Sequence, residues 1–471
     1  MRANRLNYAK PSRSPRWASD SAAMLEAKAW FDSNRLLICL VAMGVLVGFI
    51  HGWLKITIRS SATTFAFDLF FIWAFFSIVM KQGWKNLLGG TKEVSGPLKA
   101  FLVMCVFYAL APWGPSPLIS LASLRGWCFA PLMFVVGYVL FLRPIHFRCL
   151  AVLVIALCIF TGAYGLTQSY DEVLEIMKSD PWFAARYKGT FYYAEGADLQ
   201  LRIFSTFVSS GGFGGAIAFG NVLLFGLFLK NEKVQAKKIA LVVVYGFLAY
   251  VVFRTGSRTS LISMALGTMI VAMSRRGVGI LLPLIIVVGL ALGVAASKTE
   301  GLTTKRFVEG LGVDEVLFRN TFPLMGGLDR LRENPVGSGL GRSTHGVPFF
   351  LMNRLGNETY YQIDGDIGRL MVDMGIPGVV CFAWLLKSVI AFSYRIARET
   401  NEREVGDLAA VVLGLLVVAA ISLPSGSPFL GVPNGVLTWL SVGALCRNVE
   451  HLNEPALRGG IRQRLKARLA I

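Results

Sequence analysis

The feature that most constrains this chain is a series of separate apolar runs, each long enough to cross a lipid bilayer. Of its 471 residues, 54% are hydrophobic, and its mean hydropathy is +0.58. A membrane-spanning helix needs about 20 mostly apolar residues. Inside a bilayer the backbone N–H and C=O groups must pair within the segment, so such runs form helices.

We therefore expect an all-α polytopic membrane protein with about 12 transmembrane helices. The candidate spans are 36–54, 62–80, 98–112, 123–142, 148–167, 207–229, 238–253, 259–273, 278–296, 374–394, 407–423 and 430–446. Two long connections, about 168–206 and about 297–373, would face the opposite side from the chain ends. The second lies between the ninth and tenth spans and is predicted to form a helical cap, which suggests chemistry at the outer face.

The basic residues predict the orientation, because loops rich in Lys and Arg stay in the cytoplasm. The net charge of +19 is concentrated in residues 1–35, in every second short loop and in residues 447–471. We expect a bacterial inner-membrane protein with a transmembrane domain over 36–446 and both termini cytoplasmic. Residues 1–35 read as a disordered basic arm, and 447–471 as a basic tail on anionic lipid. This distribution indicates membrane lipids as partners and no nucleic acid.

The sequence predicts neither a metal nor a cofactor. The seven cysteines lie in or beside apolar runs without metal-ligand spacing, which is typical of buried small residues. There is no P-loop, no HExxH and no EF-hand loop.

Arg254 and Arg258 lie between two apolar runs, at the expected outer surface. Arginine offers a planar fork of donors that suits phosphate oxygens. Gly256 and Ser257 allow a helix break, which would expose backbone N–H groups at the start of the next helix as an anion site. The alternative is that both arginines simply extend to the membrane interface.

A second group of candidates lies in the long outer loop. Glycines at every second position, 337, 339 and 341, permit a tight backbone path. Arg330, Arg332, Arg342 and His345 flank this turn. A histidine with a pKa near neutrality is the usual general base for a hydroxyl. The group is therefore either a substrate site or an ordinary solvated loop in which the histidine is incidental.

Arg202 and Arg125 each stand at the expected outer end of a span. They would focus positive charge on one rim and attract an anionic substrate. Interfacial anchoring is the alternative for both.

Asp364 and Asp366 precede the tenth span. They could activate a hydroxyl or orient His345. They could equally pair with Arg369 or cap the following helix.

Four stretches together resemble the O-antigen ligase and polysaccharide polymerase family of bacterial membrane glycosyltransferases. They are RIFSTF at 202–207, RTGSRTSLI at 254–262, ENPVGSGLG at 333–341 and DMGIPG at 373–378. The resemblance implies a GT-C-like helical fold. It also implies periplasmic transfer of a glycan from an undecaprenyl-diphosphate carrier to a glycan or lipid A core acceptor, with other polysaccharide assembly proteins as partners.

By the same resemblance, Arg258 and either Arg330 or Arg332 would contact the donor diphosphate, and a loop histidine would deprotonate the acceptor. Many family members carry a His-Asn pair where this chain has Asp364 and Gly365. The base is therefore His345, Asp364 or Asp366, and the departure favours a polymerase or a specialised exopolysaccharide enzyme. The alternative function is a multispan transporter or flippase of a lipid-linked or anionic solute.

Overall fold

The chain folds into a bundle of long helices with one small β-hairpin. The computed structural model describes residues 16–58, 63–83, 91–179, 192–195, 198–229, 232–274, 289, 324–347, 360, 361, 363, 365–424 and 426–453. The long helices are α1 (Arg16–Ile58), α2 (Thr63–Gln82), α3 (Lys92–Ala109), α4 (Pro117–Leu140), α5 (Pro144–Thr167), α8 (Ser210–Leu223), α9 (Gln235–Arg254), α10 (Arg258–Ser274), α15 (Asp366–Glu399), α16 (Arg403–Ser422) and α17 (Asn434–Asn453). Seven helices among the described residues are long and apolar enough to cross a membrane.

The expected spans correspond to helices. Each overlaps a described helix except 278–296, of which only residue 289 is described. The span predicted at 207–229 is α8 continued by a π-helical turn, η2 (Leu224–Phe228). The length and hydropathy of these helices identify a membrane protein.

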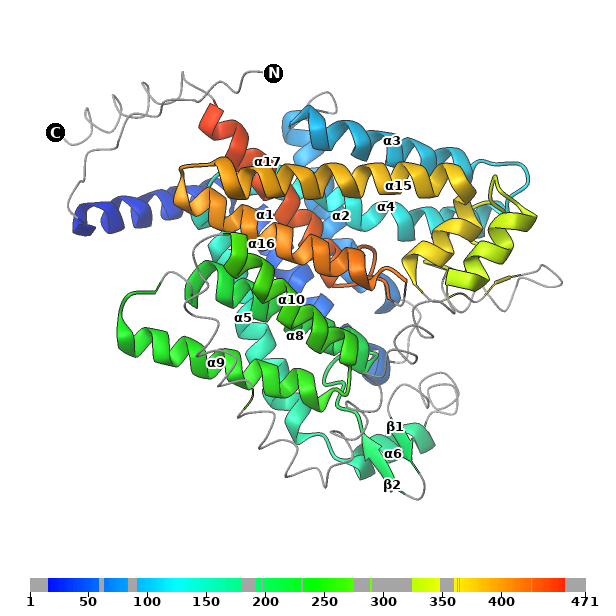
Figure 1. Ribbon diagram of the computed structural model, residues 1–471, viewed down its shortest axis with the longest axis horizontal. Coiled ribbons are helices and arrows are strands. Elements are labelled where there is room, and N and C mark those ends of the chain that lie inside the picture. Colours follow the sequence, from blue (N-terminus) through cyan, green and yellow to red (C-terminus); the bar gives the residue numbers. More distant parts are fainter. Residues whose placement is uncertain are drawn as a thin grey trace.

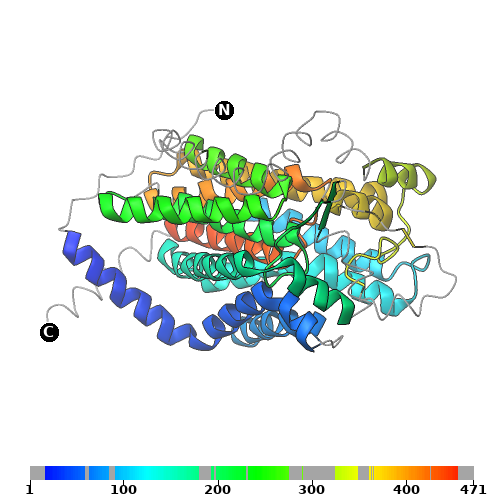
Figure 2. The same cartoon turned by 90° about the horizontal axis from the view of Figure 1, so that it is seen from below.

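The helices run side by side along the long axis of the molecule (Figure 1). Helix α17 packs mainly on α4, and α15 lies between α3 and α16. Helix α1 begins and α17 ends at the same end of the bundle. The helix at 324–333 and the β-hairpin lie at the opposite end, also when seen from below (Figure 2). The start of α1 and the end of α17, predicted to be cytoplasmic, therefore lie at the opposite end of the bundle from these elements of the two long connections, predicted to face outward.

The basic arm differs from the prediction. Helix α1 begins at Arg16 and bends at Asn34, where the backbone leaves helical geometry. Disorder is wrong for residues 16–35, because Trp30 anchors this part of the helix. Its buried indole Nε1 donates to Leu140 O at 2.8 Å, and the ring stacks on His146 at 4.3 Å. Residues 1–15 and the tail beyond Asn453 lie outside the described part.

The connection at 168–206 contains helix α6 (Tyr170–Ser179) and an antiparallel hairpin of β1 (Tyr192–Glu195) and β2 (Asp198–Leu201). The hairpin leads into the RIFSTF stretch, which is held on the bundle. There Trp53 N donates to Thr206 O at 2.9 Å, and Gln168 bonds the backbone of Ser205.

Helix α15 begins earlier than predicted and is interrupted at the predicted boundary. It begins at Asp366, whereas the sequence placed the span at 374, and Gly375 has non-helical angles of φ 60° and ψ −154°. Residues 366–374 carry two aspartates and an arginine, which lower the hydropathy. Arg369 pairs with Asp366, and Asp373 accepts hydrogen bonds from Ser343 and Trp127, so the helix extends beyond the apolar run although it carries these charges.

Candidate functional site

The glycine-rich turn at 337–341 is fixed onto the break in α15. The break leaves carbonyl groups without helical partners, and the turn supplies donors: Ser338 N bonds Val372 O at 2.8 Å and Gly339 N bonds Asp373 O at 3.0 Å. Gly337, Gly339 and Gly341 all have positive φ, as the sequence predicted for a tight path. A Cβ at Gly339 would lie 2.4 Å from Cα of Gly114, so the turn also fits closely against the residues before α4.

Asp373 organises the loop that follows this turn. Its fully buried carboxylate accepts bonds from Ser343 N and Ser343 Oγ, both at 2.8 Å. It also accepts from Trp127 Nε1 at 3.0 Å. Sequence reasoning quoted Asp373 within a family stretch but assigned it no role. Nothing in a single sequence brings positions 127, 343 and 373 together.

His345 is placed by this loop between Trp127 and Arg369. The Trp127 and His345 rings are 5.0 Å apart, and Nδ1 lies 3.4 Å from Nη1 of Arg369. A guanidinium only donates, so Nδ1 accepts and Nε2, which is buried, carries the hydrogen of the neutral ring. Burial, assisted by the charge of Arg369, lowers the pKa of His345 to about 3. These features disfavour His345 as a general base at neutral pH.

Arg369 links His345 to the bundle. Its Nη1 donates to Ser427 Oγ at 2.5 Å and its Nε donates to Ile363 O at 3.0 Å. Nη1 also lies 3.9 Å from Asp366 Oδ1. Asp366 thus lies within ion-pair distance of Arg369 in the first turn of α15, is only 1% exposed, and has no hydrogen-bond partner for either carboxylate oxygen among the described residues. Asp364 lies outside the described residues.

A cavity of about 430 Å³, the bundle cavity, lies among α8, α10, α16 and α17. Three helices begin around it: Ser209 caps α8 by accepting from Gly212 N, Ser257 accepts from Ser260 N at the start of α10, and α17 starts at Asn434. Its polar lining residues are Ser209, Ser257, Thr259, Ser260, Ser263, Ser422, Ser427, Asn434 and Thr438. Deeper along α8 and α16 the lining is apolar, with Ala218, Phe219, Val222, Leu415, Val418 and Ala419.

Arg258 is the first residue of α10, between Ser257 and Thr259, which line the bundle cavity. The helix break predicted there is confirmed, because α9 ends at Arg254 and Gly256 has φ 63°. Arg254 itself bonds the hydroxyl of Tyr250 at 3.3 Å. Arg202 donates to Thr255 O at 3.1 Å, so it stabilises the turn between the two helices.

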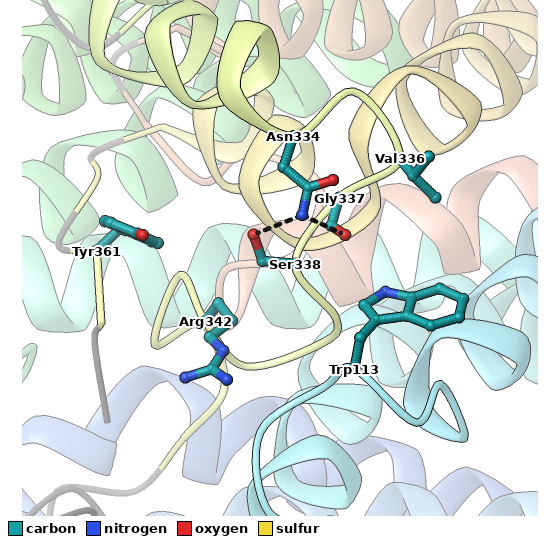
Figure 3. A pocket seen from close by; sticks show the side chains of 7 residues that line it. All are labelled: Trp113, Asn334, Val336, Gly337, Ser338, Arg342 and Tyr361. Atoms are coloured by element: carbon teal, nitrogen blue, oxygen red, sulfur yellow. Dashed lines mark hydrogen bonds between the residues drawn. The ribbon is translucent and has the colours of Figure 1, made fainter. Parts of the chain in front are cut away.

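A second cavity of about 570 Å³, the loop cavity, lies beside the glycine-rich turn. It is lined by Trp113, Asn334, Val336, Gly337, Ser338, Arg342 and Tyr361 (Figure 3). The Arg330 guanidinium lies 4.2 Å from the centre of the Tyr361 ring and pairs with Glu333 at 2.5 Å. Arg330 and Arg342 thus belong to this cavity region.

The remaining two predicted arginines make other contacts. Arg125 pairs with the buried carboxylate of Asp68 on α2, and it lies 5.0 Å from the centre of the Phe65 ring. Arg332 is 82% exposed in its side chain and pairs with Asp329 at 3.4 Å.

Of the predicted residues, only Arg342 lines one of the two cavities, whereas Arg258 lies next to lining residues of the bundle cavity and Arg330 contacts Tyr361 of the loop cavity. The two linings share no residue, and neither contains Arg258, Arg330 or His345. These two cavities therefore do not bring the three residues together. Hydrogen bonds connect the cavities, because Ser427 lines the bundle cavity and bonds Arg369, and Arg369 contacts His345 in the loop that begins at Arg342. Within the described ranges, no three His, Cys, Asp or Glu side chains are grouped as metal ligands.

Neither the models of known protein families nor the curated protein sequences give a match to this chain.

Proposed function

We propose that this protein transfers a glycan from an undecaprenyl-diphosphate carrier to a glycan acceptor at the periplasmic face of the bacterial inner membrane. It would do so as a metal-independent glycosyltransferase of the polysaccharide polymerase or O-antigen ligase type. The proposal includes about twelve spans, a GT-C-like arrangement and cytoplasmic termini.

The bundle cavity is the observation that carries the proposal. One end of it combines the starts of three helices with hydroxyl and amide side chains, and its lining farther along α8 and α16 is apolar. Helix N-termini attract anions because their backbone N–H groups and dipoles point outward. A polyprenyl diphosphate has the matching polarity, with a charged head and a hydrocarbon tail.

The reaction needs stabilisation of the leaving group. The acceptor hydroxyl oxygen attacks the anomeric carbon, the bond from that carbon to the phosphate oxygen breaks, and undecaprenyl diphosphate leaves with the bonding electrons. Preorganised positive groups stabilise this charge most strongly where water is excluded. Arg258, at the start of α10, and the helix N-termini supply such groups.

The hydroxyl proton would pass to a carboxylate, Asp364 or Asp366. His345 is the weaker candidate because its Nδ1 faces Arg369. We assign His345 and Arg369 a positioning role: they would hold the segment that carries these carboxylates.

A transporter or flippase is the second candidate. Transporters commonly hold ionisable residues near the bilayer midplane. Here Asp68 and Asp407 are buried, but each lies within the first two turns of its helix and pairs with an arginine. Their position near helix ends favours the enzyme.

The test is gene deletion, complementation and glycan profiling. In the deletion strain, the Arg258→Ala variant should be present at normal protein level but should not restore transfer. The control variant Arg398→Ala, in the last turn of α15, should restore transfer. Core capped with single repeat units would indicate a polymerase, and uncapped core with polymer on its carrier would indicate a ligase. Deletion without any change in surface glycans would overturn the function, and full activity of Arg258→Ala would remove the diphosphate site.

A further inference from the structure

The loop cavity has a composition unlike that of the bundle cavity. Two aromatic rings, Trp113 and Tyr361, lie on opposite sides of Ser338 and Arg342 (Figure 3). The Trp113 side chain comes from the turn between α3 and α4 and is 44% exposed. The Asn334 amide, the Ser338 hydroxyl and the Arg342 guanidinium supply polar groups between the rings.

These groups match the surface of a sugar. A pyranose ring has an apolar face of C–H groups, which packs on aromatic rings, and a rim of hydroxyls, which bond amides, hydroxyls and guanidinium groups. The volume of about 570 Å³ is within the usual range of small-ligand sites, about 300–1,000 Å³. We propose that the loop cavity is a glycan-binding subsite, distinct from the bundle cavity, and that it holds the acceptor glycan.

The walls of this cavity are fixed before any ligand binds. Tyr108 Oη donates to Val336 O at 2.5 Å, and the Asn334 amide donates to Gly337 O at 3.1 Å. Tyr361 N donates to Arg342 O at 2.9 Å, which joins these two lining residues. Preorganised walls reduce the ordering cost of binding.

The position of the cavity supports the acceptor role. The loop that lines it continues to His345, and His345 contacts Arg369, which bonds Ser427 in the wall of the bundle cavity. A glycan in the loop cavity and a donor in the bundle cavity would therefore lie on either side of the His345–Arg369–Ser427 contacts. The acceptor role rests on the proposed function, whereas sugar binding does not.

Direct binding tests the subsite on the purified full-length protein in detergent. The probe is a fluorescently labelled oligosaccharide fraction, released by mild acid from the surface polysaccharide of the producing cells, and the readout is fluorescence polarisation. We expect Trp113→Ala to weaken binding about tenfold or more, since it removes one aromatic wall. Trp113→Phe should retain most of the affinity, because it keeps an aromatic face.

Two controls separate this site from other surfaces. Trp73→Ala, on α2 and 65% exposed, should bind as wild type, and so should Arg258→Ala. Absence of binding by wild type, or unchanged binding by Trp113→Ala, would overturn the subsite. Trp113-dependent binding by a protein whose deletion leaves surface glycans unchanged would overturn the proposed function alone.

Discussion

Asp373→Ala tests the contact that positions the His345 loop. The substitution removes the acceptor of three donors: Ser343 Oγ, whose hydrogen can rotate, and the two buried N–H groups of Ser343 N and Trp127 Nε1, which cannot redirect theirs. A buried donor that loses its partner costs about 1–3 kcal/mol, so the loss is about 2–6 kcal/mol. The contact joins the loop to α15 through Ser343 and joins α15 to α4 through Trp127. Because Ser343 is the loop residue that loses its acceptor, we expect opening of the loop. At about 1.4 kcal/mol per tenfold change, its amides should exchange at least about 30-fold faster.

Hydrogen exchange measured by mass spectrometry on peptides covering 336–347 is the assay. Ser343→Ala is the matched control, because it removes the hydroxyl's bonds to Asp373 and His345 N but keeps the backbone donor on Asp373. It should therefore accelerate exchange much less. Exchange in Asp373→Ala at the wild-type rate, or no faster than in Ser343→Ala, would refute the assigned role of this carboxylate.

Two further predictions concern the same region. Gly375→Ala should destabilise the protein by about 2 kcal/mol or more, because φ is positive and a Cβ would lie 2.3 Å from Pro335 O. Thermal unfolding in detergent measures this loss. The control Gly96→Ala, where a Cβ meets nothing within 4 Å, should be near neutral. The lowered pKa of His345, about 3 against an ordinary 6.5, means that only the unfolded state binds the proton between these values. Stability is thus complete above pH 6.5 and falls below it by up to about 1.4 kcal/mol per pH unit, and His345→Gln should show a shallower fall in acid unfolding; an identical fall in both proteins would contradict this.

The helices were predictable because membrane spans are specified by local hydropathy. Boundaries failed where charged residues belong to a helix. Asp366, Arg369 and Asp373 lower the hydropathy of the first turns of α15, but Arg369 and Asp373 bond residues remote in sequence, Ser427 and Ser343. Contacts between residues remote in sequence also explain why residues 16–35 are helical and not disordered. Trp30 anchors this part of α1 by contacts with Leu140 and His146.

The candidate site was predictable in composition but less so in arrangement. The glycine-rich turn and the break before Arg258 follow from local residue types, and both are confirmed. The contacts of Asp373 and Arg369 join elements remote in sequence, so one chain without distances could not reveal them. Arginine patterns also could not distinguish Arg202, which stabilises a turn, from Arg342, which lines a cavity.

Four glycines of the stretch from 337 to 346 each lie against a different neighbour. An added Cβ would meet the α15 break at Gly337, the pre-α4 turn at Gly339, Ile119 at Gly341 and Gly126 at Gly346. Deleting or inserting one residue anywhere between them would force a side chain into at least one of these backbone contacts. Length in this stretch is therefore as constrained as residue type, and diversification of the loop must proceed by substitution at the intervening positions.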